Sequence, residues 1–176
     1  GMAPETVARI LASQHPISPH RLALSTVNRE GTSFTLIDDS FNANPDSMKA
    51  GLNGLKAWNS NDGKEPFRVA LLGAMLELGA DETALHTSIG TYADELGIDA
   101  IIAVGSAQDQ HLDALAQALA DGARQSQSAS VDCVHDIDAA EQLVIDLARN
   151  HPDAVVLLKG SHASGLSALA ERWAKN

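Results

Sequence analysis

The stretch LIDDSFNANPDSM, at residues 36–48, marks the change from a strand-rich start to alternating strands and helices. An apolar run ends there in two adjacent carboxylates, Asp38 and Asp39, and Asn44-Pro45 follows before a helical pattern. Proline is favoured at the first position of a helix and keeps the preceding residue out of the helical region, so we expect Asn44 to be the N-cap. The stretch therefore predicts a strand, a polar turn and a helix in succession.

The residues before this stretch predict a hairpin. Strand-like runs at residues 21–27 and 33–37 are separated by Asn-Arg-Glu-Gly at 28–31, a spacing typical of two antiparallel strands. A short amphipathic helix is expected at residues 6–12, and the two prolines of SQHPISPH indicate a linker after it. We expect His20, at the end of that linker, to be solvated.

Strand-like and helical patterns alternate through the rest of the chain. The first helical pattern repeats apolar residues at helical spacing, at Met48, Leu52, Leu55 and Trp58. Further strands are expected at 67–73, 100–105, 130–134 and 154–160, and further helices at 82–96, 108–119, 137–149 and 164–174. Parallel strands need crossover connections of this length. The alternation therefore predicts an α/β fold, a Rossmann-like, doubly wound, mostly parallel sheet with one antiparallel strand from the hairpin.

The composition argues against several partners and locations. Lys and Arg total 12 against 23 Asp and Glu, a net charge of −11, which repels nucleic acid and anionic lipid. The single cysteine, Cys133, excludes a disulfide framework and is expected to be a buried structural thiol. No apolar run approaches the ~18 residues of a membrane span. With no basic start followed by an apolar stretch, we expect a cytoplasmic protein.

Ligands of doubly wound sheets bind where the strands end, so the turns at the carboxyl edge are the candidate sites. The turn at residues 38–44 carries more hydrogen-bonding side chains than one N-cap needs, which favours a function there. In the turn at residues 159–164, Lys159 and Ser161 suit an anionic group. A lysine that extends to solvent and a serine cap would explain that turn equally well.

Motifs for bond-forming chemistry are missing from the sequence. Gly63-Lys64 lacks both the earlier glycine and the following Ser or Thr of a P-loop. There is no G-x-G-x-x-G after the first strand of the sheet, no G-x-S-x-G, and no histidine with a partner at metal-ligand spacing. The sequence thus predicts a ligand pocket without a complete catalytic set and without a metal site.

Four motifs occur in order along nearly the whole chain: SPHRLAL, LIDDSFNANPDSM, LLGAMLELG and LLKGSHASG. Together they resemble the carboxyl-terminal part of the Mur ligases. NANPDSM resembles those members that use ATP to add D-alanyl-D-alanine to UDP-N-acetylmuramoyl-tripeptide in peptidoglycan precursor synthesis. The resemblance implies that residues 1–19 are the end of a central ATPase domain plus a linker. Residues 20–176 would then be the carboxyl-terminal, ligand-binding domain of a peptide bond-forming ligase.

The resemblance also implies what other parts of the ligase supply. In this family the first domain binds the UDP-sugar, and the central domain carries the P-loop and a carboxylated lysine that helps hold magnesium. ATP and Mg²⁺ are therefore implied, with magnesium held mainly by the central domain. The implied partners are the two small substrates and the central and N-terminal domains, with no nucleic acid and no membrane. The present chain is expected to be inactive alone.

The resemblance assigns site residues by position and no catalytic residue. Arg21 matches an arginine that lies against the nucleotide, and Asp39 matches an aspartate that holds the ribose hydroxyls. Asn42 and Asn44 match asparagines on the nucleotide and dipeptide sides of the cleft. The last loop, near the incoming dipeptide, is matched by Lys159, Ser161 and His162.

The chain departs from the family pattern at three positions. Phe41 stands where Tyr is usual, which removes a hydroxyl contact, and Ala74 stands where Asp is usual. His162 replaces an arginine and is a weaker clamp for a carboxylate because histidine is only partly charged near neutral pH. His86 matches a family histidine, for which we expect a hydrogen bond in the core or at a helix start.

Two alternatives remain open. A receiver-type signalling domain also has an acidic pair after its first strand and a lysine after its last, but Gly73 and Gly105 stand where a phosphorylatable aspartate is needed. A related Mur or folylpolyglutamate-type ligase would share the fold, and NANPDSM argues against it.

Overall fold

The computed structural model describes residues 20–60 and 63–175. These form a six-stranded sheet with the order β1-β2-β6-β3-β4-β5. The first two strands pair antiparallel and all other neighbours pair parallel, so the predicted fold class is confirmed. The predicted helix at residues 6–12 and the segment 1–19 lie outside the described residues. The strands are β1 (Ala23–Arg29), β2 (Thr32–Asp39), β3 (Arg68–Gly73), β4 (Ala100–Val104), β5 (Ser130–Val134) and β6 (Val155–Lys159).

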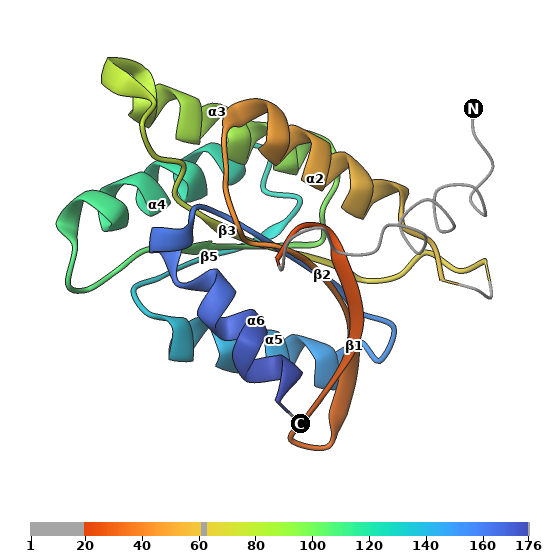
Figure 1. Ribbon diagram of the computed structural model, residues 1–176. Coiled ribbons are helices and arrows are strands. Elements are labelled where there is room, and N and C mark those ends of the chain that lie inside the picture. The colour runs from red at the N-terminus through yellow and green to blue at the C-terminus, as the bar shows by residue number, and fades with distance from the viewer. Residues whose placement is uncertain (1–19, 61–62, 176) are drawn as a thin grey trace.

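Helices cover both faces of the sheet, as Figure 1 shows. On one face lie α2 (Pro45–Ala57), α3 (Glu82–Glu95) and α4 (Gln110–Ala123). On the other lie α5 (Ile137–Asn150) and α6 (Leu166–Ala174). In the described part of the chain, no helix has both the length and the apolar character that crossing a bilayer requires.

An apolar core fills each face of the sheet. Successive residues of β3 alternate between the two cores, with Ala70 and Leu72 under α2, α3 and α4, and Val69 and Leu71 under α5 and α6. Cys133 was predicted to be buried, but it is only half-buried at the margin of the first core, because β5 is an edge strand. With both faces covered by helices, ligands are left with the edges where strands end.

The β1–β2 hairpin is tighter than the sequence suggested. Arg29 pairs with Thr32, so only Glu30 and Gly31 form the turn, and both have positive φ, 45° and 77°. Such a two-residue turn matches the twist of the strands it joins. Both strands therefore reach closer to the turn than predicted. Phe34 of β2 packs edge-on against Trp173 of α6, with ring centroids 5.1 Å apart.

The start of α2 confirms the expected cap. Asn44 has extended backbone angles, φ −139° and ψ 168°, and Pro45 opens the helix. Asn44 Oδ1 accepts from Ser47 N at 2.8 Å, and Ser47 Oγ accepts from Asn44 N at 3.0 Å. This capping box satisfies two backbone donors at once and fixes the direction in which the chain enters α2.

Two helix boundaries were predicted wrongly, the end of a helix at residue 119 and the start of the last helix at residue 164. Helix α4 continues to Ala123 because Gly122 is a contact position, where an added Cβ would lie 2.0 Å from Thr87 O of α3. Before α6, residues His162–Ser164 form a 3₁₀ turn, and Gly165 follows with φ 77°. Helix α6 therefore begins only at Leu166.

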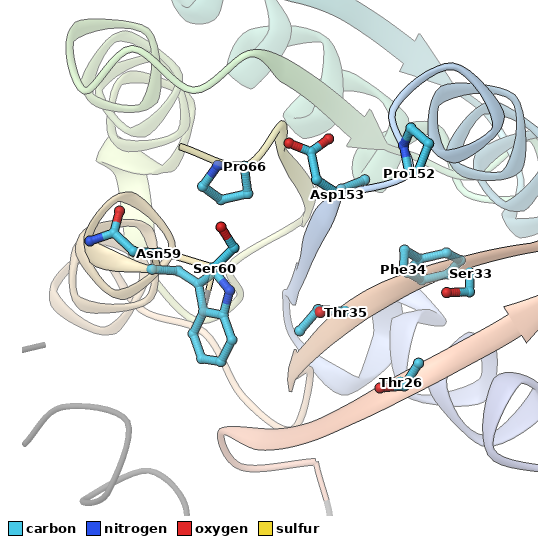
Figure 2. Close-up of a pocket in the computed structure, with 11 residues that line it drawn as sticks. Thr26, Ser33, Phe34, Thr35, Asn59, Ser60, Pro66, Pro152 and Asp153 are labelled. Atoms are coloured by element: carbon cyan, nitrogen blue, oxygen red, sulfur yellow. The ribbon is translucent and has the colours of Figure 1, made fainter. Parts of the chain in front are cut away.

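The amino edge of the sheet holds a hollow of about 220 Å³ between the hairpin, the end of α2 and the segment before β6 (Figure 2). Trp58, prolines and hydroxyl side chains line it, together with the carboxylate of Asp153. Beside it, buried Arg68 donates to the carbonyls of Leu55 and Trp58 at 3.2 and 2.9 Å and caps the end of α2. Among the described residues, the hollow has no cationic lining residue that would attract an anion.

Candidate functional site

A second cavity, of about 320 Å³, opens where β2 and β6 end at the carboxyl edge of the sheet. We call it the carboxyl-edge cavity. Its size suits a small ligand or part of a larger one. The parallel pairing of β2 with β6 sets Asp39 beside Lys159 and thereby brings two distant motifs together. The lining residues are Arg21, Leu22, Asp39, Phe41, Asn42, Asn44, Ser47 and Lys159.

Lys159 and Asp39 form an ion pair at the base of this cavity. The Nζ of Lys159 lies 2.9 Å from Asp39 Oδ2 and donates to the carbonyl oxygen of Asn42 at 2.7 Å. The lysine side chain is 3% exposed and the aspartate side chain 17%. The lysine stem passes α2 at Gly51, where an added Cβ would lie 3.4 Å from the lysine Cδ. The carboxylate is therefore the partner that a ligand can reach.

The pKa of Asp39 is raised above its ordinary value. Burial is the largest cause, because it disfavours the charged carboxylate, and the neighbouring charge of Asp38 adds to it. Lys159 opposes the rise through its hydrogen bond and its charge, and a backbone hydrogen bond from Leu22 also lowers the pKa. Lys159 thus favours the ionised carboxylate but does not fully offset the effect of burial on its pKa.

Asp38 stabilises the turn and has no place in the cavity. It is 7% exposed, and its Oδ1 accepts from the Oγ and the N of Ser40 at 2.6 and 3.2 Å. Its Oδ2 lies 2.7 Å from Nδ1 of His20. The expectation that His20 is solvated was wrong, because the carboxylate of Asp38 holds its ring in a half-buried position.

Asn42 and Asn44 use their side-chain oxygens for the backbone and keep their amide groups at the cavity. Asn42 Oδ1 accepts from Ala43 N at 2.8 Å, and Asn44 Oδ1 caps α2. Both residues are exposed. No hydrogen bond engages their side-chain nitrogens within the part of the chain that the structure describes. Both amides are therefore free to donate to a ligand.

Arg21 and Phe41 form the outer wall. The guanidinium carbon of Arg21 lies 4.5 Å from the centre of the Phe41 ring, a cation–π arrangement. Phe41 is 42% exposed, so a face or edge of its ring remains available at the cavity. Leu22 and Ser47 also line the cavity but were not predicted. Ser47 could have been predicted from its position three residues after the N-cap. Leu22 could not, because its positive φ of 48° has no sequence pattern that predicts it.

Ser161 and His162 lie outside the carboxyl-edge cavity. Ser161 N donates to Ala74 O at 2.9 Å, which joins the turn after β6 to the turn after β3. The Oγ of Ser161 is buried and makes no hydrogen bond to the described residues. His162 is exposed, and its Nδ1 lies 3.3 Å from Ser167 Oγ. The predicted site residues therefore divide into a group that lines the cavity and a separate pair in the last loop.

His86 makes the core hydrogen bonds that the sequence led us to expect. Its ring is fully buried, Nε2 accepts from Met75 N at 2.9 Å, and Nδ1 lies 2.6 Å from Glu82 O. These partners require a neutral ring with its proton on Nδ1. Burial is the main reason that the pKa of His86 is lowered. His86 thereby fixes the turn after β3, to which Ser161 is bonded.

The donor set of the described residues does not fit a metal ion. Residues 20–60 and 63–175 contain no group of three or more His, Cys, Asp or Glu side chains that could hold one. The cavity itself offers one carboxylate already paired with a lysine, together with amides and an arginine. Such a set suits hydroxyl and heterocyclic groups of an organic ligand rather than a cation.

Comparison with known proteins shows the family of the chain. A family model described as "Mur ligase, glutamate ligase domain" matches residues 20–162. The UDP-N-acetylmuramoyl-tripeptide--D-alanyl-D-alanine ligase of Mycobacterium leprae is 37% identical over 97% of this chain. The match covers 33% of that ligase, so the chain spans about a third of the length of this relative.

Solved structures show the same likeness. MurF from Acinetobacter baumannii superposes with a TM-score of 0.67 at 26% identity, over 90% of this chain and 30% of that one. The fold is also that of a MurF ligase from Thermotoga maritima in complex with ADP, with a TM-score of 0.59, 21% identity and coverage of 97% of this chain and 36% of that one. A receiver-type signalling domain is excluded by the family match. The chain belongs to the Mur ligase family, of which it contains the carboxyl-terminal domain.

Proposed function

We propose that the chain is the carboxyl-terminal domain of an ATP-dependent ligase that adds D-alanyl-D-alanine to UDP-N-acetylmuramoyl-tripeptide. The observation that carries the proposal is the carboxyl-edge cavity, in which the two motifs around Asp39 and Lys159 meet. The relative from M. leprae bears the name of this activity. Residues 1–19 are proposed to be the end of the central domain and its linker.

The cavity is proposed to hold the nucleoside end of ATP. Asp39 offers a carboxylate with several acceptor positions, which suits the two adjacent hydroxyls of a ribose. Arg21 and the exposed ring of Phe41 provide a flat, cationic surface beside it, and the amides of Asn42 and Asn44 supply donors. The ADP complex of the T. maritima ligase supports a nucleotide role for this fold.

The last loop is proposed to face the dipeptide, with Asn44 between the two ligands. Ser161 and His162 follow β6 at the same edge of the sheet, outside the cavity. The buried hydroxyl of Ser161 has no partner among the described residues, so a ligand group could satisfy it after a small shift of the loop. His162 adds a positive charge for the dipeptide carboxylate only in its protonated form.

The reaction implied for the whole ligase is amide formation through an acyl phosphate. The terminal carboxylate of the tripeptide attacks the γ-phosphoryl group of ATP and releases ADP. The amine of the dipeptide then attacks the acyl carbon, the amide bond forms, and inorganic phosphate leaves. Positioning and charge stabilisation dominate such steps. This domain would orient the nucleotide and the dipeptide, while Mg²⁺ would be held mainly by the central domain.

Phosphate release by the complete ligase, given ATP, magnesium, tripeptide substrate and dipeptide, tests the proposal. We expect release that depends on D-alanyl-D-alanine, and none from the 176-residue chain alone. Asp39→Ala should raise the KM for ATP about tenfold or more, because it removes charged hydrogen bonds to the ribose. Lys175→Met, on the exposed end of α6, serves as the control. An unchanged KM would contradict the role of Asp39, and dependence on a different amine would assign the chain to a related ligase.

A further inference from the structure

The ammonium group of Lys159 is fully engaged by the protein. It can donate three hydrogen bonds, and three acceptors surround it. Nζ lies 2.9 Å from Asp39 Oδ2, 2.7 Å from Asn42 O and 3.5 Å from Asp39 O. The side chain is 3% exposed, and its stem runs beside Gly51 of α2. No donor of this lysine is left to reach a substrate without breaking one of these contacts.

All three acceptors lie at the end of β2 or in the turn between β2 and α2. Asp39 is the last residue of β2, and Asn42 lies two residues before the N-cap of α2. A lysine on β6 therefore sets the position of a turn that begins 120 residues earlier in the chain. The contact with Lys159 also orients the carboxylate of Asp39. The lone pairs of Asp39 that the lysine does not use then point away from it.

We propose that Lys159 is a positioning residue, which orients the Asp39 carboxylate for the ribose and does not contact the dipeptide. The inference rests on the proposed function for the identity of the ligand, but the contact between the two side chains does not. It reassigns Lys159 from the dipeptide to the nucleotide side of the site. Ser161 and His162 are then left as the residues of the last loop that face the dipeptide.

The charges around Asp39 make this role measurable. Asp38 is its neighbour in sequence, and His20 is paired with Asp38 rather than with Asp39. Arg21 lines the same cavity, but its guanidinium lies over the Phe41 ring. Lys159 is therefore the cation in direct contact with Asp39 among the described residues. Removal of its charge should raise the pKa of Asp39 further.

An NMR pH titration of the Asp39 carboxyl carbon in the 176-residue chain tests the contact itself. Lys159→Met should shift the titration to higher pH, and the exposed control Lys175→Met should leave it where it is in the wild type. An unshifted titration in Lys159→Met overturns the proposal. If Lys159→Met does not fold, the double variant with Asp39→Ala decides. Recovery of the fold supports the pairing, because the uncompensated buried carboxylate is gone, and failure to recover overturns it.

Kinetics of the complete ligase test the consequence. Lys159→Met should raise the KM for ATP by about the same factor as Asp39→Ala, and the double variant should be no worse than either single one. The KM for D-alanyl-D-alanine should not change. A raised KM for the dipeptide, with effects that multiply with those of Asp39→Ala, overturns the proposal. A ligase without dipeptide-dependent phosphate release refutes the proposed function instead, while the titration still decides the role of Lys159.

Discussion

At the scale of single residues, His86 is a buried histidine that holds a turn at the carboxyl edge of the sheet. Its Nε2 accepts a hydrogen bond from Met75 N, and the carbonyl oxygen of the adjacent Ala74 accepts one from Ser161 N. The neutral ring therefore helps to fix the turn after β3, to which the turn after β6 is bonded. Glu82 contributes its carbonyl and a charge that favours the protonated ring, whereas burial and the charge of His111 oppose protonation.

The stability of the chain should depend on pH through His86. Its folded pKa lies below the ordinary value of 6.5, so the unfolded chain binds a proton more readily. The stabilising contribution is complete above about 6.5 and is lost as the pH falls from there toward the folded pKa. We expect His86→Gln to flatten this part of the profile in urea denaturation between pH 5 and 8. His135→Gln, at an exposed ring, should keep the slope, and an equal slope in His86→Gln would contradict the assignment.

The candidate site was predictable in its local part only. Asp39, Asn42 and Asn44 stand in one continuous motif, and the helix cap fixed their surroundings. The pairing of Asp39 with Lys159 depends on β6 lying between β2 and β3, which is a property of strand order. No local pattern encodes that order, because alternating strands and helices are compatible with several topologies. The half-buried contact of His20 with Asp38 was missed for another reason: it depends on the register of the hairpin, which sets Ala23 opposite Asp38.

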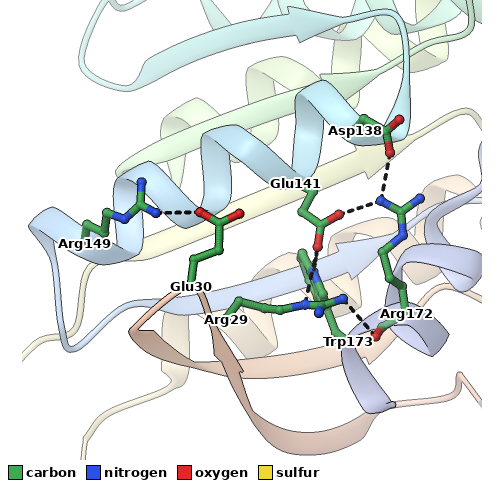
Figure 3. Close-up of polar contacts among 7 residues, drawn as sticks. All are labelled: Arg29, Glu30, Asp138, Glu141, Arg149, Arg172 and Trp173. Atoms are coloured by element: carbon green, nitrogen blue, oxygen red, sulfur yellow. Dashed lines mark hydrogen bonds and ion pairs between the residues drawn. The ribbon is translucent and has the colours of Figure 1, made fainter. Parts of the chain in front are cut away.

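At the scale of elements, an ion-pair network fastens the end of the hairpin to α5 and α6 (Figure 3). Glu141 of α5 is its centre: it accepts from Trp173 Nε1 at 2.8 Å, pairs with Arg172 and lies 3.5 Å from Arg29 Nε. Arg29 also donates to the carbonyl of Arg172 at 3.1 Å. At the hairpin turn, Glu30 pairs with Arg149 of α5 at 2.6 Å.

Loss of the Glu141 charge should weaken this attachment. Its side chain is 14% exposed and has both cationic and indole partners, unlike an ordinary surface pair. We expect Glu141→Gln to lower the free energy of unfolding by about 1–2 kcal/mol, with a smaller loss in high salt because the paired charges are screened. The control is Asp146→Asn, which breaks an exposed pair with Arg149 and should change stability by less than about 0.5 kcal/mol. Equal losses in the two variants, measured by urea denaturation, would show that the network adds nothing beyond surface pairing.

Element boundaries show where sequence patterns stop being informative. Most strands and helices were predicted to within a few residues, because apolar periodicity marks them directly. The end of α4 was missed since Gly122 reads as a helix terminator, whereas it lies inside the helix and lets α3 and α4 touch. Gly90 does the same from α3, where a Cβ would lie 1.9 Å from Leu119 O. In the sequence of a single segment, a glycine that allows two helices to pack closely cannot be distinguished from a glycine that ends a helix.

At the scale of the whole molecule, one sheet serves two cores. The strand β6 contributes Val155 and Leu157 to the core under α2, α3 and α4, and Val156 and Leu158 to the core under α5 and α6. Because alternate residues of the same strand support opposite faces, neither core can lose its sheet while the other keeps it. We therefore expect the described domain to unfold as one cooperative unit.

The two tryptophans of the chain report on opposite faces and can test this cooperativity. Trp58 packs against the first core and Trp173 lies in the second. In the single-tryptophan variants Trp173→Phe and Trp58→Phe, the fluorescence transition in urea should coincide with the loss of circular dichroism. Leu52→Ala, under α2, should lower the stability seen by Trp173 as much as that seen by Trp58, by about 2–5 kcal/mol. Different urea midpoints for Trp58 and Trp173 would contradict this prediction. They would mean that the two faces unfold as separate cooperative units although they share the strands of one sheet.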